Sequence, residues 1–113
     1  MIIQKLKTIL KTNPTTISFT QTIAVIDHNF NFTPTRFTNG VLKNNVGENS
    51  GSCKLFGFAK LQKLTNEETL FCFGEHYKSV LEDAQGTSHQ NIRNFMKYGF
   101  DGLSFDSEPL HVK

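Results

Sequence analysis

The sequence predicts a small α+β domain that is mainly helical, with about five helices and a small antiparallel sheet. The first observation behind this prediction is that apolar residues recur at helical spacing in several segments that begin with capping residues. The second is that short β-prone segments lie between turn residues in the middle and at the end of the chain. Because 37% of the 113 residues are hydrophobic and 12% aromatic, we expect one compact domain over residues 1–113.

The N-terminal part of the chain predicts two helices. The first has an apolar face that consists of Ile2, Ile3, Leu6, Ile9 and Leu10. We expect this helix to end at Asn13-Pro14, because proline disfavours helical geometry in the residue before it. A capping box at Ser18-Phe19-Thr20-Gln21 then predicts a second helix over about residues 18–30.

The middle of the chain predicts extended structure, a turn and a third helix. Residues 31–40 favour extended backbone, and Asn39-Gly40 is a strong turn signal. Residues 41–51 are rich in Asn and Gly and predict a loop. We expect Ser52 to cap a third helix that runs from Cys53 to about Leu64.

A second capping box, Thr65-Asn66-Glu67-Glu68, predicts the start of a fourth helix. Its apolar residues repeat at helical spacing from Leu70 through Tyr77 to Leu81, which predicts one continuous helix. Gly74 falls on the apolar face, where a missing side chain would let another segment approach closely.

The C-terminal part of the chain predicts a fifth helix and two strands. Thr87-Ser88-His89-Gln90 has the form of a third capping box. Gly99 suits the left-handed position after a helix, with Phe100 in contact with Phe95. We expect residues 103–105 and 110–112 to pair as a hairpin beside a strand over residues 32–38.

Composition excludes several classes of partner. A net charge of +2 is too small to indicate nucleic acid, and no apolar run is long enough for a membrane span. With two cysteines and no signal peptide, we expect reduced thiols in a cytosolic protein. No metal-ligand spacing is present, so we expect no metal and no cofactor. The pattern does not distinguish a monomer from an oligomer.

Several short motifs are spread over residues 18–106, among them Phe32-Thr33-Pro34-Thr35, Phe37-Thr38-Asn39-Gly40, Gly51-Ser52-Cys53-Lys54 and His89-Gln90-Asn91-Ile92-Arg93-Asn94-Phe95-Met96. In these motifs the chain resembles the HopJ family, type III effectors of plant-associated bacteria that also occur more widely in bacteria. The resemblance implies a protein of the bacterial cytoplasm that a type III system also secretes into a host cell. It implies no particular reaction.

One interpretation of the polar segments is catalytic. Cys53, then His76 or His89, then Asn91 or Asp101 gives the order of a nucleophile, a base and an orienting group. A helix N-terminus at Cys53 would lower the pKa of its thiol. The competing interpretation is a small structural cysteine in the first turn of a core helix.

The other interpretation is a binding surface. Arg93 beside Asn94, with Asn39 and Asn49, has the donors to grip a carboxylate or phosphate. The competing interpretation has the asparagines holding loops together through backbone hydrogen bonds. In that case Arg93 forms an ion pair, and its candidate partners are Asp27, Glu48 and Asp101.

We therefore favour a non-enzymatic binding protein that contacts a protein partner or a small polar ligand. The expected site includes Asn39, Asn49, Cys53, His89 and Arg93. The alternative is a small cysteine-dependent hydrolase or transferase that uses Cys53 and His89.

Overall fold

The computed structural model describes residues 2–113, which form a mainly helical α+β fold measuring 34 × 31 × 21 Å. The helices are α1 Ile3–Thr12, α2 Phe19–Asn29, α3 Ser50–Gln62, α4 Asn66–Phe71, α5 Glu75–Glu82 and α6 Gln90–Tyr98, with 3₁₀ helices η1 Pro14–Thr16 and η2 Gly99–Gly102. The strands are β1 Phe30–Phe32, β2 Phe37–Asn39, β3 Leu42–Asn44, β4 Leu103–Phe105 and β5 Leu110–Val112. The predicted fold class is confirmed, with six α-helices in the described residues where about five were expected.

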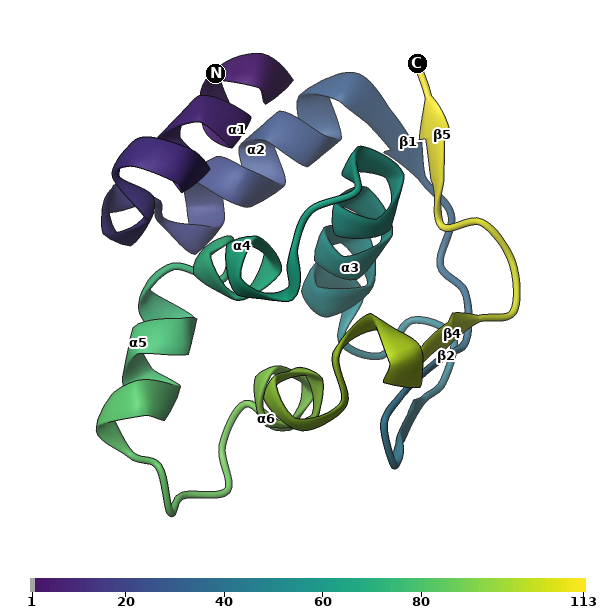
Figure 1. Ribbon diagram of the computed structural model, residues 1–113. Coiled ribbons are helices and arrows are strands. Elements are labelled where there is room, and N and C mark those ends of the chain that lie inside the picture. The colour runs from purple at the N-terminus through teal and green to yellow at the C-terminus, as the bar shows by residue number, and fades with distance from the viewer. Residues whose placement is uncertain (1) are drawn as a thin grey trace.

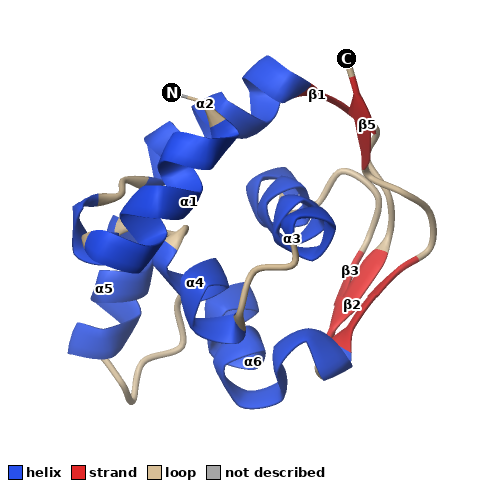
Figure 2. Cartoon of the chain, turned by 45° about the horizontal axis from the view of Figure 1, so that its top comes forward, coloured by secondary structure: helices blue, strands red, loops and turns tan. Residues whose placement is uncertain are grey.

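Helix α3 lies in the middle of the molecule. Helices α1 and α2 lie on one side of it, α4 and α6 on another, and the strands beyond it (Figures 1 and 2). The side chains of Leu55, Phe56, Phe58 and Ala59 are all 0% exposed, although they point to different sides of the helix. A helix that is apolar on all sides belongs in a core.

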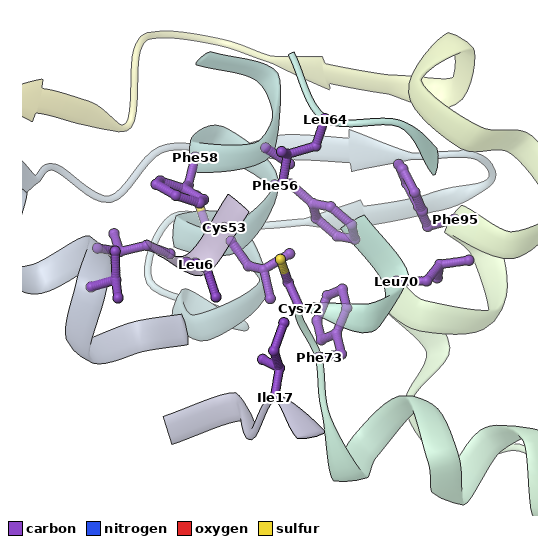
Figure 3. Packing of buried hydrophobic residues seen from close by; sticks show 14 of the residues in the cluster. Leu6, Ile17, Cys53, Phe56, Phe58, Leu64, Leu70, Cys72, Phe73 and Phe95 are labelled. Atoms are coloured by element: carbon purple, nitrogen blue, oxygen red, sulfur yellow. The ribbon is translucent and has the colours of Figure 1, made fainter. Parts of the chain in front are cut away.

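Phe56 of α3 is the centre of an aromatic cluster. Its ring centroid lies 6.4 Å from that of Phe37, 5.4 Å from that of Phe73 and 5.0 Å from that of Phe95. Figure 3 shows Phe56, Phe73 and Phe95 side by side within the buried cluster. The cluster joins strand β2, the link between α4 and α5, and helix α6 to the central helix.

The helix boundaries near the N-terminus follow the predicted signals. Helix α1 ends at Thr12, directly before Asn13-Pro14. In the capping box of α2, the Gln21 N–H donates to Ser18 Oγ at 3.1 Å, and the Ser18 N–H donates to Gln21 Oε1 at 3.0 Å. The same reciprocal pair forms at Thr65 before α4.

The prediction of one continuous helix after Thr65 is wrong, because the chain breaks at Gly74 into α4 and α5. Gly74 has φ 57° and ψ −124°, a conformation that other residues rarely adopt. A Cβ atom there would lie 2.6 Å from the Phe19 nitrogen and 2.8 Å from the Ile17 oxygen. The expected close approach at Gly74 is therefore confirmed, and it coincides with the break.

Two separate antiparallel sheets form, with strand order β3-β2-β4 and β1-β5. The Asn39-Gly40 turn is confirmed, since Asn39 pairs with Leu42 across a two-residue connection. Strand β4 lies beside β2 as expected, but the predicted hairpin of residues 103–105 with 110–112 is wrong. Strand β5 instead pairs with β1, where Pro109 lies against Gly57 of α3 and the Thr33 N–H donates to Pro109 O at 2.8 Å.

Residues 41–51, expected to be a loop, contain strand β3 and the start of α3. Helix α3 begins at Ser50, so Ser52 is not its N-cap. The prediction relied on a capping side chain, but Asn49 precedes the helix and no side-chain capping bond forms.

We predict that Gly74→Ala lowers the free energy of unfolding by at least about 3 kcal/mol, because the new Cβ combines backbone strain with contact against the chain at Ile17–Phe19. Gly47→Ala is the matched control, since Gly47 has φ 85° but nothing within 4 Å of the added atom. The control measures conformational strain alone, roughly 1–2 kcal/mol. Urea denaturation of both variants gives the difference, and equal losses would contradict the steric argument.

Candidate functional site

A network of four asparagine side chains, three of them buried, joins the two strands of the β2-β3 hairpin to the starts of α3 and α6. Asn91 Nδ2 donates to Asn44 Oδ1 at 3.0 Å, and Asn44 Nδ2 donates back to Asn91 Oδ1 at 3.2 Å. Asn39 Nδ2 donates to the Asn91 carbonyl at 2.7 Å. Asn49 Nδ2 donates to Asn44 Oδ1 at 2.7 Å. We call Asn39, Asn44, Asn49 and Asn91 the asparagine network.

The asparagine network holds the starts of α3 and α6 in fixed positions relative to each other. Buried amides are tolerated only when they are hydrogen-bonded, and a network of them is geometrically demanding. Asn39, Asn44 and Asn91 are 0%, 1% and 6% exposed. Within the described residues, Asn39 Oδ1 is the one buried side-chain oxygen or nitrogen without a partner.

A cleft of about 430 Å³ lies next to this network, between the starts of α3 and α6. We call it the polar cleft. Its lining residues are Phe19, Leu42, Asn49, Gly51, Ser52, Phe73, His76, His89, Gln90, Asn91 and Ile92. The residues therefore come from α2, α3, α6, strand β3 and the region around α5, with first-turn residues of both α3 and α6.

Both helices that begin at the polar cleft lack a capping side chain. The N-cap residues Asn49 and His89 have φ values of 51° and 52°, in the left-handed region, and neither makes a side-chain capping bond. The capping box predicted at Thr87–Gln90 is therefore wrong, since the Gln90 amide donates to the Thr87 carbonyl instead. Uncapped N–H groups in a first helical turn stay open to water or a ligand.

Two imidazoles lie together at the polar cleft. The ring centroids of His76 and His89 are 5.0 Å apart, and the edge of the Phe19 ring packs against His76 at 4.9 Å. Within residues 2–113, neither imidazole takes part in a side-chain hydrogen bond or ion pair. His89 is exposed and His76 is half-buried, and both line the polar cleft.

Two acidic residues near the polar cleft bind backbone N–H groups. The Glu75 carboxylate accepts the Phe19 N–H at 2.8 Å, which caps the start of α2. This bond, with that from its own N–H and the neighbouring His76, lowers the pKa of Glu75. Glu48 Oε1 accepts the Asn45 N–H at 2.8 Å. Neither Glu48 nor Glu75 lines the polar cleft.

The structure does not bring Cys53, His89 and Asp101 together at the polar cleft. Cys53 is 2% exposed, and its thiol points to the Thr35 carbonyl at 4.0 Å. Burial raises the pKa of Cys53, against a smaller lowering by the Thr35 hydrogen bond, so the expected lowering by the helix N-terminus is wrong. Asp101 is exposed and follows α6, whereas His89 precedes it.

Arg93 and Asn94 bind their own surroundings. The Arg93 guanidinium donates to the Ser88 and Ala84 carbonyls, and so braces the loop between α5 and α6 at the lower left of Figure 1. The ion pairs expected with Asp27, Glu48 or Asp101 do not form, and Asp27 instead pairs with Lys54 at 2.9 Å. Asn94 Nδ2 donates to the Gln90 carbonyl at 2.9 Å.

The sequence interpretation did not identify Asn44 as part of the site. The signal that could have identified Asn44 is the two-residue turn after Asn39, because the hairpin register set by this turn pairs Asn44 with the buried Phe37. The interpretation of asparagines as loop staples is supported for Asn39, Asn49 and Asn91, whose bonds connect separate segments.

Comparison with known proteins gives a matching family and a similar solved structure. The model of the family described as HopJ type III effector protein matches residues 3–110. The structure is also similar to one described as the crystal structure of unknown function protein VPA0580, with a TM-score of 0.97 and 45% sequence identity. That likeness covers 100% of this chain and 95% of that chain. No curated protein matches the chain.

We predict that Asn91→Ala lowers the free energy of unfolding by about 2–3 kcal/mol, because it removes three buried side-chain hydrogen bonds to Asn39 and Asn44 and leaves only the bond from Asn39 to the Asn91 backbone carbonyl. Asn94→Ala is the matched control on the same helix, since it removes one bond to the preceding turn and about 1 kcal/mol. Denaturant titration of both variants provides the comparison. A smaller loss for Asn91→Ala than for Asn94→Ala would show that the network adds no stability.

We predict that neither cysteine of the folded protein is alkylated by iodoacetamide near neutral pH, because both thiols are buried and neutral. Both should react quickly in concentrated urea, and rapid labelling of the folded protein would contradict this prediction.

Burial, with a smaller effect of Glu68, raises the pKa of Cys72 from 9.0 to about 12. The free energy of unfolding should therefore decrease as the pH rises from 9.0 towards 12, and Cys72→Ala should reduce that slope.

Proposed function

The chain belongs to the HopJ type III effector family, and we propose that it is a non-enzymatic binding protein with the polar cleft as the binding site for a small polar ligand. The observation that carries the proposal is the asparagine network, which fixes two uncapped helix starts on either side of the cleft. Binding groups that are already held in place lose little conformational freedom when a ligand arrives. The site is therefore preorganised for recognition.

The size and lining of the polar cleft support a small ligand as the first candidate occupant. A volume of about 430 Å³ lies within the usual range of small-molecule sites, roughly 300–1,000 Å³. The lining contains more polar residues than the usual small-molecule site, since Asn49, Ser52, His76, His89, Gln90 and Asn91 lie beside a smaller set of apolar residues such as Phe19 and Leu42, and this favours a polar ligand. A protein partner that inserts a polar side chain would satisfy the same groups.

The position of Cys53 gives no support to the alternative cysteine-dependent enzyme. A nucleophilic thiol has to reach the substrate and to ionise readily. Cys53 is buried in the core with its pKa raised, and the two imidazoles lie at the cleft. Figure 3 shows Cys53 and Cys72 among the buried hydrophobic side chains.

Family membership supports a place of action as part of this proposal. We propose that the protein acts in the bacterial cytoplasm, or in a host cell after type III secretion. None of the helices described in residues 2–113 is long and apolar enough to cross a membrane.

We predict that some compounds in a panel of small polar molecules bind the polar cleft. In ¹⁵N–¹H correlation spectra of the protein, these compounds should shift the backbone amide resonances of Gly51, Ser52, Gln90 and Asn91. Cys53→Ala should bind the same compounds with unchanged affinity, because its thiol lies outside the cleft. Shifts confined to other surfaces would contradict the proposed site. Turnover of a bound compound that Cys53→Ala abolishes would favour the enzyme.

A further inference from the structure

We infer that the ligand of the polar cleft carries an anionic group, either a carboxylate or a phosphate. This inference rests on the proposed function and names the chemical class of its ligand. It depends on the imidazole pair, on the polar atoms around it and on the kinds of charge that line the cleft.

The imidazole pair supplies hydrogen-bond donors that the protein itself leaves unused. His76 and His89 approach each other to 5.0 Å between ring centroids, from different segments of the chain. Each neutral imidazole carries one N–H donor, and each protonated imidazole carries two and a positive charge. Two such rings side by side repel each other when both are charged, and an anion between or beside them relieves that repulsion.

The cleft has further donors besides the imidazole pair, although the side-chain amide nitrogens of Asn49 and Gln90 already donate to Asn44 and Thr87. Ser52 contributes a hydroxyl group, and Gln90 lies in the first turn of α6. The starts of α3 and α6 carry the positive ends of their helix dipoles and have no capping side chain. These groups add to the imidazole pair and favour negative charge at the same place.

The side chains that line the cleft disfavour a cation. Within the described residues no Asp or Glu lines the polar cleft; Glu48 accepts the Asn45 N–H, and Glu75, which lies next to His76, accepts the N–H of the lining residue Phe19. Hard metal ions prefer carboxylate oxygens, and no group of three or more potential metal-binding side chains occurs in residues 2–113. An organic cation would meet two helix dipoles of the wrong sign.

The apolar part of the lining indicates the rest of the ligand. Phe19 and Leu42 are the partly exposed apolar residues of the lining, whereas Phe73 and Ile92 also line the cleft but are each 2% exposed. A ligand with a small apolar body and one anionic group matches this division, because its body packs against the rings while its anion meets the imidazoles.

A matched series of four compounds tests the inference, namely benzoate, phenyl phosphate, benzamide and benzamidine. They share one ring and differ in the charge and shape of the head group. We expect benzoate or phenyl phosphate to shift the amides of Gly51, Ser52, Gln90 and Asn91, with little effect of benzamide and benzamidine. The tighter of the two anions identifies a carboxylate or a phosphate as the natural head group.

Histidine variants test whether the imidazole pair recognises the anion. His76→Gln and His89→Gln, singly and together, should weaken binding of the tighter anion by about tenfold in the double variant. His28→Gln and His111→Gln are controls, because both side chains are exposed outside the cleft and should leave binding unchanged. The single variants keep the test informative if the double variant does not fold.

The outcomes separate the inference from the proposed function. If benzamide or benzamidine shifts the cleft amides as strongly as the anions do, the site binds ligands but the anion inference is overturned. Equal affinity of the anion for the wild type and the double variant also overturns it. If none of the four compounds shifts the cleft amides while other panel compounds do, the inference fails and the proposed function stands. If no compound of either set shifts them, both fail.

Discussion

The burial of the middle of helix α3, where residues 55–59 are all buried, is the constraint on which the rest of the structure depends. Each strand has three residues and α4 has six, so none of these elements is stable in isolation. They gain stability by covering an apolar helix that the chain cannot leave in water. Gly57 shows how closely they cover it, because an added Cβ would lie 2.8 Å from the Pro109 ring. The short C-terminal strands are therefore held by the helix they cover.

The site follows from this arrangement, because the polar cleft lies at the exposed start of the same buried helix. The core fixes the axis of α3, and the asparagine network fixes its first turn against α6 and the β2-β3 hairpin. Buried amides stabilise a fold less than good apolar packing does, and they are demanding in geometry. The asparagine network at one end of the core therefore serves as a rigid support for the polar surface of the cleft.

Local chemistry explains which features the sequence predicts. The capping boxes at Ser18 and Thr65 and the stop before Pro14 depend on neighbouring residues alone, and all three form. The break at Gly74 depends on the approach of residues 17–19, so apolar spacing continues across it without a signal. The pairing of β5 with β1 joins segments that are far apart in the sequence, so no local signal predicts it either. Of the expected site residues, Asn49 and His89 line the cleft, and Asn39 supports it from below the surface. Arg93 and Asn94 instead donate to nearby backbone carbonyls. Which polar residues face the cleft and which bind backbone depends on tertiary contacts that the sequence does not reveal.

The first turn of α3 shows how one helix start separates two kinds of chemistry. Successive residues of a helix point about 100° apart, so Gly51 and Ser52 line the polar cleft while Cys53 points into the core. A helix start favours a thiolate only where the charged sulfur keeps contact with water or a ligand. Burial therefore has the larger effect on Cys53 and keeps its thiol neutral. The electrostatic effect of the helix start remains available on the cleft side, where it would favour the anionic ligand that we propose and not a nucleophilic thiolate.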